Sequence, residues 1–530
     1  GSTVAHVARA ALESIAFHFT EGVLAGSPEE AVDAATEAGE AAIGRSVGAQ
    51  AQLFFERALA TIDVCELEDA ERRYRALDGM GRASVLRLDT EGWTSSFVAA
   101  ALLAREQGWS ARFVDSVIAA TQLGDIGGVI DPRVEALLAE ARSLAGDGRQ
   151  LAGLLCGSSA AAYGRGDFGE AASQARAALD VARQTGDLDT IAQAQWTVCT
   201  YRFGLDPPEV VAADLRALEA AVERRAGDQY GSMYGSLTQV LEGLRCLAAL
   251  QRGDRAEVEG YLAAAAELPG MNRRFNVPYW AATLANLDGR LDDQMALADE
   301  LVARFPDYAI SHVCHLSQLL DVTLEREGWG AAKPIADRTS ELMGAAAATF
   351  EASRAAMMAR HGELEDAEGA VRRGLGLLAD GDGGSNRPLT AAGIAEAAWA
   401  MRRPEWAEAV LDELQPHLGA MITYSFGWRV FPADLPWGFA LLALGDRDGA
   451  VGHMERAVSA AERFDAPALA LRCRLALVQA LRARAGAGDH DRAVDELEAA
   501  TAGASSLGLV ETLAHCRALA APGATSGGSV

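Results

Sequence analysis

The sequence predicts an all-α protein, a solenoid of stacked helical hairpins, and two observations carry that prediction. Half of the residues are hydrophobic but only 6% are aromatic, and alternating β-branched runs are rare. A glycine turn also recurs, and from Gly253 to Gly488 its copies are 34 to 43 residues apart. This period is typical of tetratricopeptide-like arrays, which wind into a right-handed superhelix. The turns are expected at Gly166, Gly253, Gly289, Gly328, Gly362, Arg403, Gly445 and Gly488.

The clearest copy, Ala440 to Pro467, shows how one unit is built. Ala450, Met454, Ala457 and Ala461 recur at helical spacing and predict one apolar face. A single hairpin cannot bury this face, so the next hairpin must cover it. The glycine of each turn can end the first helix in a left-handed conformation, and the aspartate that follows is expected to cap the second helix.

The chain is expected to divide into successive helical sections. The second section has glycines in EGWTSS, EQGWSA and GDIGGVIDP, which predict longer loops between helices. The Gly-rich stretch DGDGGSNRP predicts a flexible hinge between two arrays. The expected sections are a lead-in (3–64) whose main helix starts at Ser27, an irregular segment (65–148), a first array (149–379), a linker (380–388), a second array (389–520) and a disordered tail (521–530).

Charge and composition exclude several functions. The net charge of −27 argues against direct binding of nucleic acid, because phosphate contacts need concentrated positive charge. The chain has one lysine, Lys333, and no P-loop. No apolar stretch is long enough to span a membrane. Seven scattered cysteines, never in a C-x-x-C pair, predict a reduced, cytoplasmic protein with cysteines buried as small hydrophobes.

Reactive motifs are lacking, so we expect neither an enzyme nor a bound cofactor or metal. His312 and His315 are three residues apart around Cys314, but no fourth ligand lies nearby in the sequence. Ordinary helix packing is therefore the favoured interpretation of this group.

Aromatic and arginine side chains concentrate between two tryptophans in the middle of the chain, although aromatics are scarce elsewhere. Repeat proteins commonly hold ligands on the inner surface of the solenoid, so these residues are the candidates for binding a ligand or partner. Packing between hairpins is the favoured alternative. The candidates are Trp196, Tyr201, Arg202, Tyr230, Tyr234, Arg273, Arg274, Phe275, Tyr279 and Trp280. A second cluster, Tyr424, Phe426, Trp428, Phe431 and Trp437, predicts a long connection folded against the array.

Four segments resemble, in order, the arm that follows the ATPase core in large actinobacterial signal-transduction ATPases. They begin with SIAFHFTEGV at Ser14, GDIGGVIDP at Gly124, RRFNVPYW at Arg273 and AVGHMERAV at Ala450. The resemblance covers most of the chain, from Ala5 to Ala520. Members are similar to the maltose regulator, in which an ATPase core and an output module flank a tetratricopeptide arm.

What this resemblance implies is a sensor arm of a LuxR-type, ATP-dependent transcriptional regulator. Binding of a small-molecule inducer or protein partner would release the ATPase core. The chain itself lacks the ATPase and any output module, so no catalytic or DNA-binding residue carries over. Two alternatives remain open: a stand-alone protein-interaction scaffold, and the regulatory arm of a class III adenylyl cyclase.

Overall fold

The structure is a computed structural model of the chain. It describes residues 27–45, 47–87, 89–121, 131–202, 208–224, 231–232, 235–267, 275–306, 308–344, 347–380, 384–423 and 429–521.

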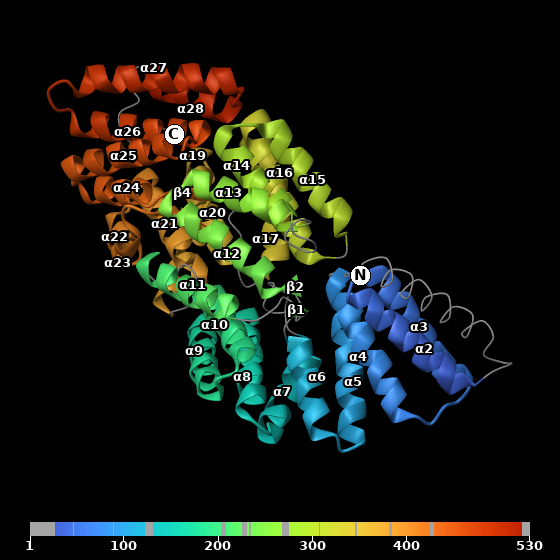
Figure 1. The fold of residues 1–530 in the computed structure, drawn as a ribbon. Helices are drawn as coiled ribbons and strands as arrows, with labels where there is room; N and C mark the ends of the chain where they lie inside the picture. Colours follow the sequence, from blue (N-terminus) through green and yellow to red (C-terminus); the bar gives the residue numbers. More distant parts are fainter. Residues whose placement is uncertain are drawn as a thin grey trace.

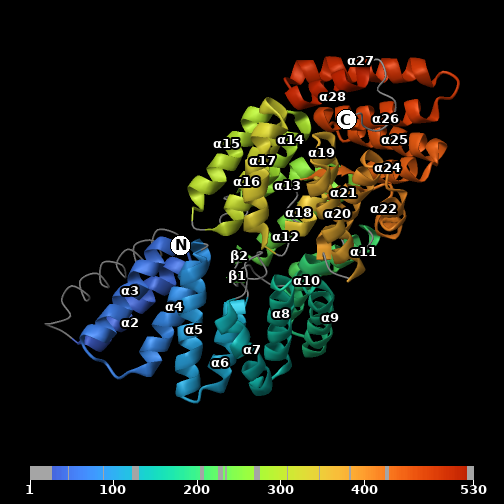
Figure 2. The ribbon, with the colours of Figure 1, turned by 180° about the vertical axis from the view of Figure 1, so that it is seen from behind.

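Consecutive helices pack side by side throughout the described residues. The described part of the chain is therefore an all-α solenoid of helical hairpins (Figures 1 and 2). The first helices form an open arc. They are α2 (Pro28–Ile43), α3 (Gly48–Val64), α4 (Ala70–Arg87), α5 (Thr90–Glu106), α6 (Ser110–Thr121), α7 (Pro132–Leu144), α8 (Gly148–Gly164), α9 (Phe168–Thr185), α10 (Leu188–Arg202) and α11 (Pro208–Glu223).

The second half of the chain curls back on itself, so that α14 and α16 lie against α26 and α28 (Figures 1 and 2). Its first elements are β1 (Gly231–Ser232), β2 (Gly235–Ser236), α12 (Leu237–Arg252), α13 (Arg255–Glu267), α14 (Val277–Asp288), α15 (Leu291–Arg304), α16 (Ala309–Glu327), α17 (Trp329–Met343), α18 (Ala347–Ala352), α19 (Ala355–Arg360) and α20 (Leu364–Ala379). Then follow η5 (Gly384–Asn386), α21 (Arg387–Ala400), α22 (Pro404–Glu408), α23 (Leu411–Leu414), η6 (Gln415–His417), β3 (Met421–Thr423), β4 (Val430–Pro432), α24 (Asp434–Leu444), α25 (Arg447–Arg463), α26 (Pro467–Arg484), α27 (Asp489–Leu507) and α28 (Val510–Ala520).

The predicted glycine turns are confirmed. All seven of these glycines lie in the left-handed region, with φ between 70° and 87°. At the eighth turn, predicted at Arg403, the preceding Arg402 takes the left-handed conformation instead, with φ of 56°. An L side chain tolerates this region poorly, so glycine is the natural choice where a helix must end abruptly.

The aspartates behind these turns cap helices as expected in three cases. Asp167, Asp254 and Asp446 each accept a hydrogen bond from the backbone N–H three residues further on, at 2.9 to 3.0 Å. Asp489 differs, because it is already the first residue of α27 and its carboxylate pairs with Arg484 at 2.6 Å. The helix start predicted at Ser27 is also confirmed, since its hydroxyl accepts the N–H of Glu30.

Small residues let the helices approach closely. On α25, Ala450, Met454, Ala457 and Ala461 are all fully buried, which confirms the predicted apolar face. On α21, a Cβ atom at Gly393 would lie 2.2 Å from the carbonyl oxygen of Ala352, so only glycine fits there.

The longer loops expected in the second section are partly wrong. The sequence EGWTSS lies inside α5, because Gly92 donates its N–H to the capping carboxylate of Asp89 and so belongs to the first helical turn. EQGWSA holds a turn of only three residues, with Gly108 at φ 70°. The third stretch, GDIGGVIDP, lies mostly outside the described residues.

The described part of the expected linker is structured. Residues 384–386 form η5, in which Asn386 is buried, and α21 begins at Arg387. One continuous hydrophobic core joins residues from Val211 to Cys516, on both sides of this stretch. The division into two arrays stays a prediction.

Contacts between distant segments close the second half of the chain. Arg255, at the start of α13, donates a hydrogen bond of 2.6 Å to the carbonyl oxygen of Asp465. The antiparallel pair β3–β4, in which Ile422 faces Phe431, lies against α12. Of the second aromatic cluster, Phe431 lies on β4 and Trp437 on α24, whereas Tyr424, Phe426 and Trp428 lie outside the described residues.

Two further findings concern cysteines and membranes. Six of the seven cysteines are buried, and Cys65 is half-buried, which agrees with their predicted role as small hydrophobes. Within the described ranges, no helix combines the length and apolar character needed to cross a membrane.

Candidate functional site

The described aromatic candidates divide between separate cores. Tyr201 on α10 is buried and its ring lies 5.0 Å from that of Tyr163. Phe275, Tyr279 and Trp280 are brought together at the start of α14 and are 2 to 6% exposed. Burial on this scale gives these four rings little surface to offer a ligand, as the packing interpretation expects.

The structure says less about the remaining candidates for ligand binding. Trp196 on α10 is half-buried, and its indole N–H has no hydrogen-bond partner among the described residues. The side chain of Arg202 and the whole of Tyr230, Tyr234, Arg273 and Arg274 lie outside the described residues. A binding role for this group stays a prediction.

The histidines around Cys314 are used in ordinary contacts. Nε2 of His312 lies 2.6 Å from the carbonyl oxygen of Pro306, and Nε2 of His315 lies 2.9 Å from the Asp299 carboxylate. Cys314 is buried, which raises its pKa to about 12. In the part of the chain that the structure describes, no cluster of three or more ligand side chains could hold a metal ion.

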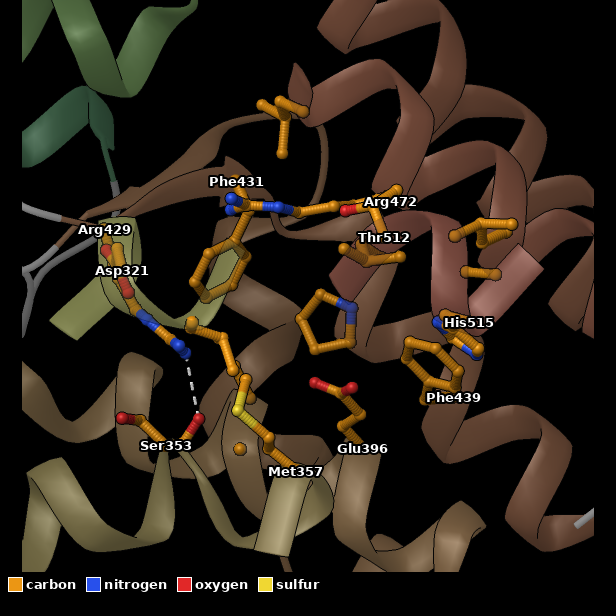
Figure 3. Close-up of a pocket in the computed structure, with 18 of the residues that line it drawn as sticks. Asp321, Ser353, Met357, Glu396, Arg429, Phe431, Phe439, Arg472, Thr512 and His515 are labelled. Carbon is orange, nitrogen blue, oxygen red and sulfur yellow. Dashed lines mark hydrogen bonds between the residues drawn. The ribbon is translucent and has the colours of Figure 1, made fainter. Parts of the chain in front are cut away.

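A cavity of about 190 Å³ lies where the second half of the chain closes on itself (Figure 3). Its walls come from separate parts of the sequence, namely α14, α16, α19, α21, β4, α24, α26 and α28. The apolar part of the wall includes Met357, Leu389, Phe431 and Phe439. Arg360 and Glu396, which also line the cavity, have side chains that are 36% and 34% exposed.

The acidic side chains of this wall have partners. Glu325 of α16 is 5% exposed and accepts hydrogen bonds from the N–H and hydroxyl of Thr512 on α28, at 3.2 and 3.0 Å. Because Leu509 cannot cap α28 with its side chain, the carboxylate of Glu325 performs that task from a distant helix. Glu396 pairs with Arg360 at 2.6 Å.

The link between α28 and its neighbours continues at Glu511, which pairs with Nε2 of His361 at 3.0 Å. The His361 ring in turn stacks on Trp329, with ring centroids 6.0 Å apart. His515, one turn further along α28, also lines the cavity. Its burial, with Arg360 and His361 nearby, lowers its pKa to about 3, so its ring is neutral at neutral pH.

Arginines supply the positive charge. Arg429 enters from the start of β4 and donates a hydrogen bond of 2.9 Å to the carbonyl oxygen of Ser353 (Figure 3). Burial lowers the pKa of Arg429; Asp321 opposes this effect, and the guanidinium of Arg472 adds to it. Arg472, on α26, comes within 3.8 Å of Glu325 and is 40% exposed.

Sequence reasoning missed this site because its residues come from six or more separated elements. A weak signal existed in two helices. Arg472 lies within the largely apolar run PALALRCRLALV, and Glu325 follows the apolar residues of LLDVTL. Glu325 is 5% exposed, and a charged residue buried on a helix is rare unless it is paired or binds something.

No protein-family model matches the chain, and no curated protein matches it. Similar solved structures include a Cut9–Hcn1 hetero-tetramer of the APC/C (13% identity, 94% of this chain and 95% of that chain covered, TM-score 0.49). Yeast Tom70 (12% identity, 89% and 96%, TM-score 0.31) and a human IFIT1 dimer with PPP-AAAA (13%, 83% and 88%, TM-score 0.22) are more distant.

The packing of the helices themselves therefore establishes the fold. In fold, the described part of the chain is a tetratricopeptide-like solenoid of helical hairpins. Stacked hairpins expose an extended curved surface on which other molecules can bind.

Proposed function

We propose that this chain is the ligand-sensing regulatory arm of a cytoplasmic, ATP-dependent transcriptional regulator. In this proposal a small-molecule inducer binds the cavity between α16 and α28. The arm then changes its contacts with an ATPase core and an output module. The single observation that carries the proposal is the position of the cavity. It lies where α16 meets α26 and α28, which are far apart in the sequence.

This position suits a sensor for a physical reason. A ligand that contacts both α16 and α28 favours the closed arrangement over any arrangement in which the two helices separate. A ligand shifts such an equilibrium only by its differential affinity for the two states. Curvature of the solenoid would thus depend on the occupancy of the cavity. The order of family-like segments along the sequence supports the attachment to an ATPase core.

The binding step can be tested with a small-metabolite library and thermal unfolding of the purified chain. A ligand at 100 times its Kd stabilises a folded protein by about 2.7 kcal/mol. Leu435→Trp fills the cavity, because Leu435 lies on its wall and is only half-buried. Leu444→Trp is the matched control, since Leu444 is 39% exposed at the far end of the same helix.

The expected result is a ligand that raises the melting temperature of the parent and of Leu444→Trp but not of Leu435→Trp. Equal stabilisation of all three would place the ligand elsewhere. The regulatory step needs the intact protein: removing the arm should abolish the response of the output to the ligand. Unchanged output with and without the arm would overturn the regulatory role.

A protein partner remains the alternative occupant of the scaffold. The same library distinguishes the two, because a pure protein scaffold would show no ligand sensitive to Leu435→Trp. The cyclase-arm alternative differs only in the output that the arm controls.

A further inference from the structure

Arg472 is the charged group of the cavity with the weakest protein partner. Its guanidinium approaches Glu325 only at 3.8 Å, and both oxygens of that carboxylate already accept from Thr512. Among the described residues, Arg472 donates no hydrogen bond, whereas Arg360 and Arg429 each donate one at 2.6 and 2.9 Å.

The acidic groups of the wall are already compensated. Glu325, Glu396 and Glu511 accept from Thr512, Arg360 and His361, respectively. Asp321, which is 8% exposed, lies close enough to the guanidiniums of Arg354 and Arg429 for its charge to oppose the lowering of their pKa values by burial. Among the described residues of the wall, Arg472 is therefore the cationic donor group without a close partner, and each acid has a cationic or hydrogen-bonding neighbour.

The proximity of two guanidiniums indicates that the ligand carries a negative charge. Arg429 and Arg472 lie close enough to repel each other, and this repulsion lowers the pKa of Arg429 beyond the effect of burial. An anion placed at Arg472 would offset the repulsion and take up its free N–H donors. A carboxylate matches the planar fork of a guanidinium with two parallel hydrogen bonds.

Size and wall chemistry limit the rest of the ligand. A cavity of about 150 Å³ holds benzene, so the 190 Å³ here fits on the order of eight to ten non-hydrogen atoms. Met357, Leu389, Phe431 and Phe439 line the remaining wall, and His515 is neutral beside them. A ligand held wholly inside this volume is smaller than a peptide or a nucleotide, and an apolar tail fits the wall.

We propose that the ligand of this cavity is a small carboxylic acid with a short apolar tail, whose carboxylate binds Arg472 and whose tail lies against Phe431, Met357 and Phe439. This inference rests on the proposed function, which it deepens by naming the ligand class. Arg472 sets the specificity for the anion, and the apolar wall sets the length of the tail.

The test uses three probes of equal length: hexanoate, hexanamide and hexylamine. They share an apolar tail and differ in the charge of the head group. Binding to the full chain is measured by calorimetry and by thermal unfolding at neutral pH. We expect hexanoate to bind at least about tenfold more tightly than either of the others, because a hydrogen bond between charged groups strengthens binding by at least about this factor.

Two arginine variants locate the interaction. Arg472→Gln should raise the Kd of hexanoate at least about tenfold and leave that of hexanamide unchanged. Arg474→Gln is the matched control on α26, since Arg474 pairs outside the cavity with Glu462 and Glu496. Its Kd for hexanoate should equal that of the parent.

The possible failures are distinguishable. Equal affinity for hexanoate in the parent and in Arg472→Gln overturns the inference, as does tighter binding of the amide or the amine. If hexanoate does not bind but another metabolite stabilises the parent and not Leu435→Trp, the ligand class is wrong and the proposed function stands. If no compound shows that sensitivity, both fail.

Discussion

The carboxylate of Glu325 on α16 accepts both the backbone N–H and the hydroxyl of Thr512 on α28, although 187 residues separate them. This contact joins the middle of the chain to α28, the last helix of the described residues. It also gives α28 the N-terminal acceptor that its own sequence lacks. The closed half of the solenoid thus depends on a buried, charge-assisted hydrogen bond as well as on apolar packing.

The first prediction concerns this contact. Glu325→Ala should lower the free energy of unfolding by about 1 to 3 kcal/mol, because it leaves the N–H of Thr512 buried without an acceptor. Amide hydrogen exchange should rise first in α28. Urea unfolding and exchange measurements check both effects. Glu462→Ala, which removes an exposed ion pair of Arg474, should cost less than about 1 kcal/mol; an equal loss in both variants would contradict the prediction.

The second prediction concerns a close approach of backbones. Gly393→Ala should destabilise the protein by about 1 to 3 kcal/mol, because the new Cβ atom would meet the Ala352 carbonyl oxygen and the Ser353 Cα. Gly376→Ala is the matched control, since a Cβ atom at this exposed helical position meets nothing within 4 Å. The control should gain about 0.5 to 1 kcal/mol. Denaturant midpoints that fall for both variants would refute the packing argument.

The glycines of the fold illustrate which features the sequence could predict and which it could not. The repeat of glycine turns predicted the solenoid, because a left-handed turn is a local requirement that the residue type itself records. The helix face around Met454 was predictable for the same reason, since apolar periodicity is local. Gly393, by contrast, sits mid-helix without a turn, and only its neighbour Ala352 explains it.

The cavity could not be predicted because its residues meet through the curvature of the whole solenoid. Small rotations between successive hairpins accumulate over many repeats, and no single repeat encodes the contact of Glu325 with Thr512. The aromatic candidates Tyr279 and Trp280 stood out by composition, yet the structure uses both in the core. Scarcity of a residue type indicates a special position and does not distinguish packing from binding.

The third prediction concerns pH. The guanidinium of Arg484 beside Asp489 holds the pKa of that carboxyl at about 2, below its ordinary value of 3.8. The unfolded chain therefore binds the proton more readily, so this pair stabilises the fold above pH 3.8, and its contribution disappears as the pH falls through 2. Asp489→Asn should lower the free energy of unfolding at pH 7 by about 1 to 2 kcal/mol.

The measurement is the difference in unfolding free energy between the parent and Asp489→Asn from pH 7 down to pH 2.5. This difference should stay constant to about pH 5 and then shrink steadily. Asp491→Asn, an exposed change in the same first turn of α27, should show a smaller difference at pH 7. A difference for Asp489→Asn that does not change with pH would mean that Arg484 does not act on it through charge.

The last prediction concerns thiol reactivity. Cys65 follows α3 and is the half-buried cysteine, while the other six are buried. Burial also raises the pKa of Cys473 to about 12, so that almost no reactive thiolate forms at pH 8. Iodoacetamide should therefore modify Cys65 alone in the folded chain, and all seven in urea. Peptide mass mapping measures this, and Cys65→Ser should stay unmodified without urea. Rapid modification of Cys473 in the folded protein would show that α26 opens far more readily than its burial implies.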